Sequence, residues 1–177
     1  MGYVRQLLSL ANDTGLRLAF DLNELHGRNC HYQNTTQCNG TWDTSNVRAF
    51  LTYVRDNNLG PLLGFEMGNE LTRSGHITMK ENIADFQTLA AIFADVWPDA
   101  QDRPPIYGPS TDVCDESVRE FLLGTRDFLT AFTYHSYPDL DGSNSSRALL
   151  DPEWLRSGIL LNDRHAASYN CVKIWEE

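Results

Sequence analysis

The stretch Leu62-Leu63-Gly64-Phe65-Glu66-Met67-Gly68-Asn69-Glu70 decides the fold class of this chain. A short, mostly apolar run of this kind is typical of a buried strand in a parallel sheet. Gly60-Pro61 precedes the run and marks its beginning. Asn69 and Glu70 follow the run directly, so the sequence predicts a polar group at the carboxyl end of a buried strand.

Outward from this strand, helical and strand-like patterns alternate along the chain. Apolar residues at helical spacing predict helices over 4–11, 47–54, 81–97 and 117–123, and Asp151-Pro152 opens a further one. Short apolar runs predict strands at 16–22, 62–67, 105–108, 128–134 and 171–175, and residues 23–43 are expected to form a long polar loop. Such alternation indicates a parallel sheet with crossover helices.

Two architectures fit that alternation, an open doubly wound sheet and part of a (β/α)8 barrel. The turn Asp21-Leu22-Asn23-Glu24 after the first strand lacks the glycines of a nucleotide-binding open sheet. Polar residues instead follow every strand: Asn23 and Glu24, Asn69 and Glu70, Ser110 to Asp112, His135 and Tyr137, and Glu176 and Glu177. Barrel active sites are built at that rim. We therefore predict an α/β fold, an incomplete (β/α)8 TIM barrel, with residues 1–177 forming a fragment of one catalytic domain, because a whole barrel takes about 250 residues.

Composition excludes several functional classes. The chain has 177 residues and a formal charge of −10, which disfavours non-specific binding to nucleic acid. No apolar run reaches the roughly 18 residues that a membrane span needs. Four Asn-x-Ser/Thr sequons, at Asn12, Asn34, Asn39 and Asn144, indicate a secreted, extracellular or lysosomal glycoprotein. Cys30 and Cys38 bracket a polar loop and predict a local disulfide, whereas Cys114 and Cys171 lie in different segments.

Paired carboxylates carry the strongest chemical signal. Glu70 and the terminal Glu176-Glu177 pair each follow a predicted strand, and hydrolysis of a glycosidic bond needs two carboxyl groups. His135 and Tyr137 are expected to hydrogen-bond a catalytic carboxylate, and Trp175 to form the wall of a sugar subsite. Asp21, Glu24, His26, Glu70 and His135 are an alternative set of metal ligands, but none shows a tight ligand spacing, so we expect neither a metal nor a cofactor.

The stretch Phe65-Glu66-Met67-Gly68-Asn69-Glu70-Leu71 resembles the strand-4 motif Trp-Glu-Leu-Gly-Asn-Glu-Pro of glycoside hydrolase family 79, the heparanase family. Four further stretches are similar to family strands in order and spacing: 14–23 to strand 3, 106–109 to strand 5, 132–137 to strand 6 and 172–177 to strand 7. The resemblance spans nearly the whole chain and implies strands 3 to 7 of a barrel.

This resemblance implies a retaining hydrolase of β-glucuronidic or similar bonds in a polysaccharide or proteoglycan glycan. Glu70 is then the acid/base, Asn69 binds the sugar 2-hydroxyl, Asn23 ends strand 3 at the substrate, and Glu177 is the nucleophile with Glu176 as the fallback. We expect the fragment alone to be inactive. The resemblance leaves the oligomeric state open.

Three positions depart from the family pattern. Leu71 replaces a proline, Ser136 stands where a second histidine is frequent, and residues 110–116 are acidic where heparan-sulfate-cleaving members are basic. Like charges repel a sulfated polyanion, so glucuronidase chemistry is favoured over heparan specificity. Two alternatives stay open: a non-catalytic carbohydrate-binding or interaction homologue on the same barrel, and a metal-dependent barrel hydrolase.

Overall fold

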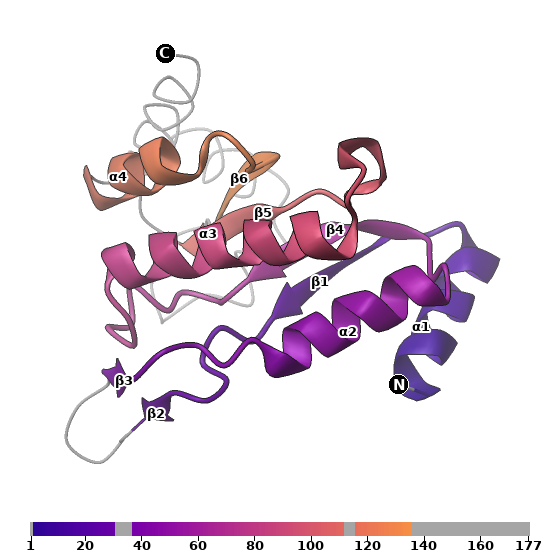
Figure 1. The fold of residues 1–177 in the computed structure, drawn as a ribbon, viewed down its shortest axis with the longest axis horizontal. Coiled ribbons are helices and arrows are strands. Elements are labelled where there is room, and N and C mark those ends of the chain that lie inside the picture. Colours follow the sequence, from indigo (N-terminus) through magenta and orange to yellow (C-terminus); the bar gives the residue numbers. More distant parts are fainter. Residues whose placement is uncertain (1, 31–36, 112–115, 136–177) are drawn as a thin grey trace, which may run out of the picture.

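The computed structural model describes residues 2–30, 37–111 and 116–135, and Figure 1 shows how its helices and strands are arranged. The elements in chain order are α1 (Gly2–Thr14), β1 (Leu18–Leu22), β2 (Asn29–Cys30), β3 (Cys38–Asn39), α2 (Ser45–Asp56), β4 (Leu62–Met67), α3 (Met79–Val96), a 3-10 turn (Ala100–Asp102), β5 (Tyr107–Thr111), α4 (Glu116–Thr125) and β6 (Ala131–Tyr134). The chain is thus a mixed α/β fold, as predicted.

The four longer strands run parallel. β1 pairs with β4, and β5 pairs with β6. A parallel bridge between Phe65 and Ile106 joins the two pairs, and the Phe65 amide donates to the Pro105 carbonyl at 2.9 Å. The resulting order β1, β4, β5, β6 follows the chain order, which is consistent with part of a barrel.

The hydrophobic core lies between these strands and the helices α2, α3 and α4, with α3 contacting both of the other two (Figure 1). Phe65 at its centre is fully buried, and its ring contacts those of Phe20, Phe50 and Phe93. Gly108 admits the ring of Phe86 so closely that an added Cβ would lie 2.4 Å from it. Phe20 and Phe65 face the helices. Successive residues of a strand point to opposite faces, so Asp21 and Glu66, which follow them, face the other side of the sheet.

Helix boundaries follow local capping chemistry. α3 begins two residues earlier than predicted, because Thr78 and Glu81 form a reciprocal capping box. α2 begins at Ser45, two residues before the predicted range 47–54, and Thr44 at its N-cap makes no side-chain hydrogen bond. The Asp43 carboxylate instead accepts from the Ser45 amide at 2.9 Å.

Two strand predictions need correction. The strand predicted at 105–108 is displaced to Tyr107–Thr111, because the pairing with β6 continues as far as Thr111, across a register shift at Ser110, whose φ is 54°. β6 starts at Ala131 rather than 128, because the carbonyl of Thr125 at the end of α4 accepts from the amides of Phe128 and Leu129. The strand at 62–67 is confirmed in its predicted bounds. The helix predicted from Asp151 and the strand predicted at 171–175 lie outside the described residues.

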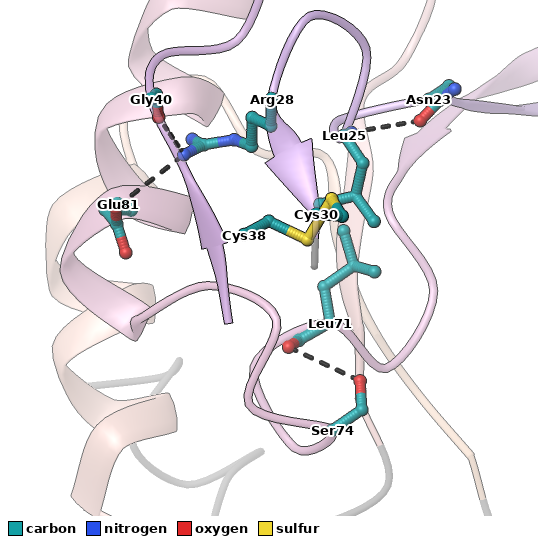
Figure 2. Close-up of a disulfide and its surroundings, with 9 residues drawn as sticks. All are labelled: Asn23, Leu25, Arg28, Cys30, Cys38, Gly40, Leu71, Ser74 and Glu81. Atoms are coloured by element: carbon teal, nitrogen blue, oxygen red, sulfur yellow. Dashed lines mark hydrogen bonds and ion pairs between the residues drawn. A yellow bond between two sulfur atoms is a disulfide. The ribbon is translucent and has the colours of Figure 1, made fainter. Parts of the chain in front are cut away.

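The predicted long loop at 23–43 contains a short antiparallel hairpin. β2 and β3 pair through Asn29 with Asn39 and Cys30 with Cys38, and the two cysteines form the predicted disulfide (Figure 2). The Cys38 amide donates to the His76 carbonyl at 2.7 Å, which attaches the hairpin to the loop after Glu70. Cys114 and Cys171 lie outside the described residues, as do the sequons at Asn34 and Asn144.

Candidate active site

The turn after β4 holds Glu70 in an unusual backbone conformation. Gly68 and Glu70 both have positive φ, 74° and 53°. A left-handed conformation costs a non-glycine residue about 1–3 kcal/mol and persists only where the surroundings enforce it. Two hydrogen bonds do so here: the Gly68 amide donates to the Leu22 carbonyl at 3.0 Å, and the Glu70 amide donates to the Ser110 carbonyl at 2.9 Å. The ends of β1, β4 and β5 therefore fix this turn together.

The Glu70 carboxyl is hydrogen-bonded to the imidazole of His135, with 2.7 Å between Oε1 and Nδ1. Both side chains are about three-quarters buried, and the His135 amide donates to the Thr111 carbonyl at the end of β5. The Oγ of Ser110 lies 3.5 Å from the other ring nitrogen. When Glu70 is ionised, Nδ1 is the donor, so His135 orients the carboxylate. The structure thus brings together two residues that the sequence singled out.

Two further carboxyl groups lie on the sheet face that turns away from the helices. Asp21 and Glu66 are register partners, one residue beyond Phe20 and Phe65 of the core. Partial burial raises the pKa of the Asp21 carboxyl, and the charge of Glu66 raises this pKa further. A backbone hydrogen bond with Gly68 and the charge of His135 oppose the rise. His135 therefore interacts with Asp21 on β1 and with Glu70 in the turn after β4.

Asp21 is a further candidate for the active site. The sequence indicated it only as one of several scattered metal ligands. The usable signal is strand alternation: Leu22 is buried beneath the helices, so Asp21 must face the other side. Within residues 2–30, 37–111 and 116–135, no group of three or more His, Cys, Asp or Glu side chains is arranged to hold a metal ion.

A pocket of about 280 Å³ opens beside this turn, at the carboxyl ends of β1 and β4. Its lining residues are Asp21, Leu22, Asn23, Glu24, Leu25, Gly68, Asn69 and Leu71. The pocket therefore contains both asparagines that the sequence assigned to the substrate. The Oδ1 of Asn23 accepts from the Leu25 amide at 3.0 Å and shapes the turn after β1. The indole Nε1 of the buried Trp42 donates to the Asn23 carbonyl at 3.0 Å, which also restrains this turn.

Glu24, which the sequence placed among the polar residues after the first strand and among the alternative metal ligands, is a buried group. Its side chain is 0% exposed and accepts two hydrogen bonds from Asn82 of α3, at 3.0 and 2.9 Å. Burial raises the pKa of the Glu24 carboxyl well above its usual range, and the carboxylate of Asp85 adds to this. The buried guanidinium of Arg28 pairs with Asp85 and, at 3.6 Å, with Glu81.

Four predicted residues lie outside the described part of the chain: Glu176, Glu177, Tyr137 and Trp175. Their positions relative to Glu70 therefore stay predictions. No helix within the described ranges is long and apolar enough to cross a membrane.

The profile of Glycosyl hydrolase family 79, N-terminal domain, matches residues 1–164. The chain belongs to glycosyl hydrolase family 79. The protein named Heparanase-like protein 2 from Arabidopsis thaliana is 30% identical over 155 residues, which are 84% of this chain and 28% of that relative. This family 79 chain therefore spans less than a third of the relative's length. Membership confirms the family resemblance and supports a function of the glycoside hydrolase type.

Proposed function

We propose that this family 79 chain carries the acid/base half of a retaining glycoside hydrolase, with Glu70 as the acid/base. The observation that supports the proposal most is the 2.7 Å hydrogen bond between Glu70 and His135 at the ends of two parallel strands. A carboxyl group held in one orientation at the rim of a barrel suits proton transfer to a glycosidic oxygen. Asn69, adjacent to Glu70 and in the pocket wall, would bind the sugar 2-hydroxyl.

The second carboxylate is assigned to Glu177, with Glu176 as the fallback. In the proposed reaction Glu70 protonates the leaving oxygen while Glu177 attacks the anomeric carbon, which gives a covalent glycosyl-enzyme. Glu70 then removes a proton from the water that releases the sugar. A retaining enzyme needs the two carboxyl groups about 5–5.5 Å apart. This chain would supply strands 3 to 7 of the barrel, and residues 1–177 would belong to one catalytic domain.

The proposed substrate is a β-glucuronidic or similar bond in a polysaccharide or proteoglycan glycan. Asp21 and Glu66 share one side of the sheet, Glu70 follows β4 at its carboxyl end, and the chain carries a net charge of −10. This acidity disfavours a densely sulfated chain, because every nearby like charge weakens binding. The Cys30–Cys38 disulfide supports a secreted, extracellular or lysosomal location, because such bonds persist in oxidising compartments.

Hydrolysis of p-nitrophenyl β-D-glucuronide by the whole protein that carries this chain tests the proposal. Glu70→Ala should lower the rate by roughly 10²–10⁴-fold, the usual contribution of a general acid/base. Azide should restore part of the rate, since it attacks the glycosyl-enzyme without a general base. Glu120→Ala, which removes an exposed carboxylate on α4, is the matched control and should leave the rate unchanged.

The same assay separates the alternatives. A wild-type protein that binds glucuronides without cleaving them would be the non-catalytic homologue. Loss of activity on treatment with EDTA would favour a metal-dependent hydrolase, whereas the proposed mechanism needs no metal, so EDTA should have no effect. A folded Glu70→Ala variant that azide does not rescue would refute the role given to Glu70.

A further inference from the structure

The buried carboxyl of Glu24 lies directly against the turn that carries Glu70. A Cβ added to Gly68 would lie 2.5 Å from Oε2 of Glu24, so the carboxyl packs on the Gly68 backbone with no side chain between them. Glu24 follows β1 by two residues, whereas Gly68 precedes Glu70 by two. The contact therefore joins the end of one strand to the turn of the next.

Helix α3 holds this carboxyl from the other side. Asn82 donates to both of its oxygens, and the nearby charge of Asp85 helps to raise the pKa of the Glu24 carboxyl. Burial is the main cause of this raised pKa, and it favours the protonated form of the Glu24 carboxyl. Arg28 pairs with Asp85 and donates to the Gly40 carbonyl at 2.6 Å, which ties the cluster to the disulfide hairpin (Figure 2).

We propose that Glu24 is a positioning residue, which holds the Gly68–Glu70 turn and thereby aims the Glu70 carboxyl at the glycosidic oxygen. This inference rests on the acid/base role proposed for Glu70. Glu70 has a left-handed conformation, which persists in a non-glycine residue only where the surroundings enforce it. Two such restraints are the hydrogen bonds to Leu22 and Ser110, and the Glu24 carboxyl is the third.

Loss of Glu24 should impair proton donation in particular, rather than all steps. A misplacement of about 1 Å can cost roughly 10²-fold in rate. A poor leaving group such as phenolate needs the proton, whereas 2,4-dinitrophenolate departs without it. A residue that only stabilises the fold would lower activity on both substrates equally, because it changes the amount of active protein.

The experiment compares kcat/KM of the whole protein for phenyl and 2,4-dinitrophenyl β-D-glucuronide. Glu24→Ala should lose roughly 10²-fold on the phenyl substrate and far less on the dinitrophenyl one. Glu24→Gln keeps the shape and one acceptor oxygen for Asn82, so it should restore most of the phenyl rate. Glu24→Asp draws the carboxyl back from Gly68 and should show the same leaving-group dependence where alanine prevents folding. Val96→Ala, a buried truncation at the far end of α3, should affect both substrates alike.

The outcomes separate this inference from the proposed function. If Glu70→Ala shows no leaving-group dependence, the acid/base assignment falls. If Glu70→Ala shows leaving-group dependence but Glu24→Ala and Glu24→Asp show none, the positioning role of Glu24 alone is refuted.

A second measurement does not depend on activity. The ring ¹⁵N signals of His135, assigned by their absence in His135→Gln, report the hydrogen bond to Glu70. They should shift in Glu24→Ala and stay in place in Glu24→Gln and Val96→Ala. Unchanged His135 signals in a folded Glu24→Ala or Glu24→Asp variant would overturn the inference.

Discussion

Glu24→Gln should make the stability of this protein less dependent on pH. Glu24 is fully buried, and the groups that face it are Asn82, Asp85 and, through Asp85, Arg28 and Glu81. Burial raises the pKa of its carboxyl well above the usual range, and the nearby Asp85 charge has the same effect. Glutamine keeps the size and both hydrogen-bonding functions but carries no proton that titrates.

The sign of the effect follows from proton linkage. Below the ordinary glutamate pKa of 4.5, Glu24 is protonated in both the folded and the unfolded chain. Above it, the unfolded chain releases the proton while the folded chain keeps it, so the free energy of unfolding falls as pH rises. The slope for one proton is about 1.4 kcal/mol per pH unit, and it continues until the raised pKa is passed. Glu24→Gln lacks this loss, so its stability relative to wild type should grow with pH.

Thermal unfolding from pH 5 to 7 measures the difference. For a chain of this size, about 1.4 kcal/mol corresponds to a change in Tm of roughly 3–6 °C per pH unit. Glu120→Gln, at an exposed position of α4, is the matched control and should follow the wild-type curve. Parallel curves for wild type and Glu24→Gln would mean that Glu24 is ionised in the folded protein, and the reasoning would be refuted.

Two further predictions concern the packing around the site. Replacing Cys30 and Cys38 by serine should lower the free energy of unfolding by about 2.5 kcal/mol, from the chain-entropy expression for this short loop. Urea unfolding measures this, and an unchanged midpoint would show that the other contacts already restrain the hairpin. Gly108→Ala should cost about 1–3 kcal/mol through overpacking, because its Cβ would meet the Phe86 ring at 2.4 Å. Gly2→Ala, with nothing within 4 Å, is the control, and equal Tm values for the two variants would contradict the prediction.

Helices and strands were predictable where a local pattern of apolar residues matches the side chains that the fold buries. The run 62–67 became β4 in its expected bounds, since an apolar segment between Gly60-Pro61 and Gly68 has well-marked ends. β5 was displaced because Ser110 and Thr111 have polar side chains, and the strand reaches Thr111 only because this residue pairs with Tyr134 of β6 beyond the register shift at Ser110. The hairpin β2–β3 was missed for a similar reason: its strands of two residues carry no periodicity, although the disulfide between them was foreseen.

The sequence singled out several residues of the candidate site, but it did not predict their contacts. Glu70, Asn69, Asn23 and His135 each follow a strand, and strand ends of a parallel sheet share one edge. Strand alternation indicates that Asp21 faces away from Phe20 and Leu22, but it does not indicate which residues lie beside Asp21 on that face. Pairing with β4 placed it beside Glu66 on the side away from the helices.

The sequence by itself determined the α/β alternation, the family and the carboxylate after β4, because hydrophobic periodicity and short motifs act over a few neighbouring residues. The tertiary structure alone decided that Glu70 meets His135, 65 positions away, and that Glu24 meets Asn82, 58 positions away. Such pairs depend on strand order and on how α3 packs over the sheet. No local pattern encodes these distances, and so the polar contacts of the site exist only in the folded chain.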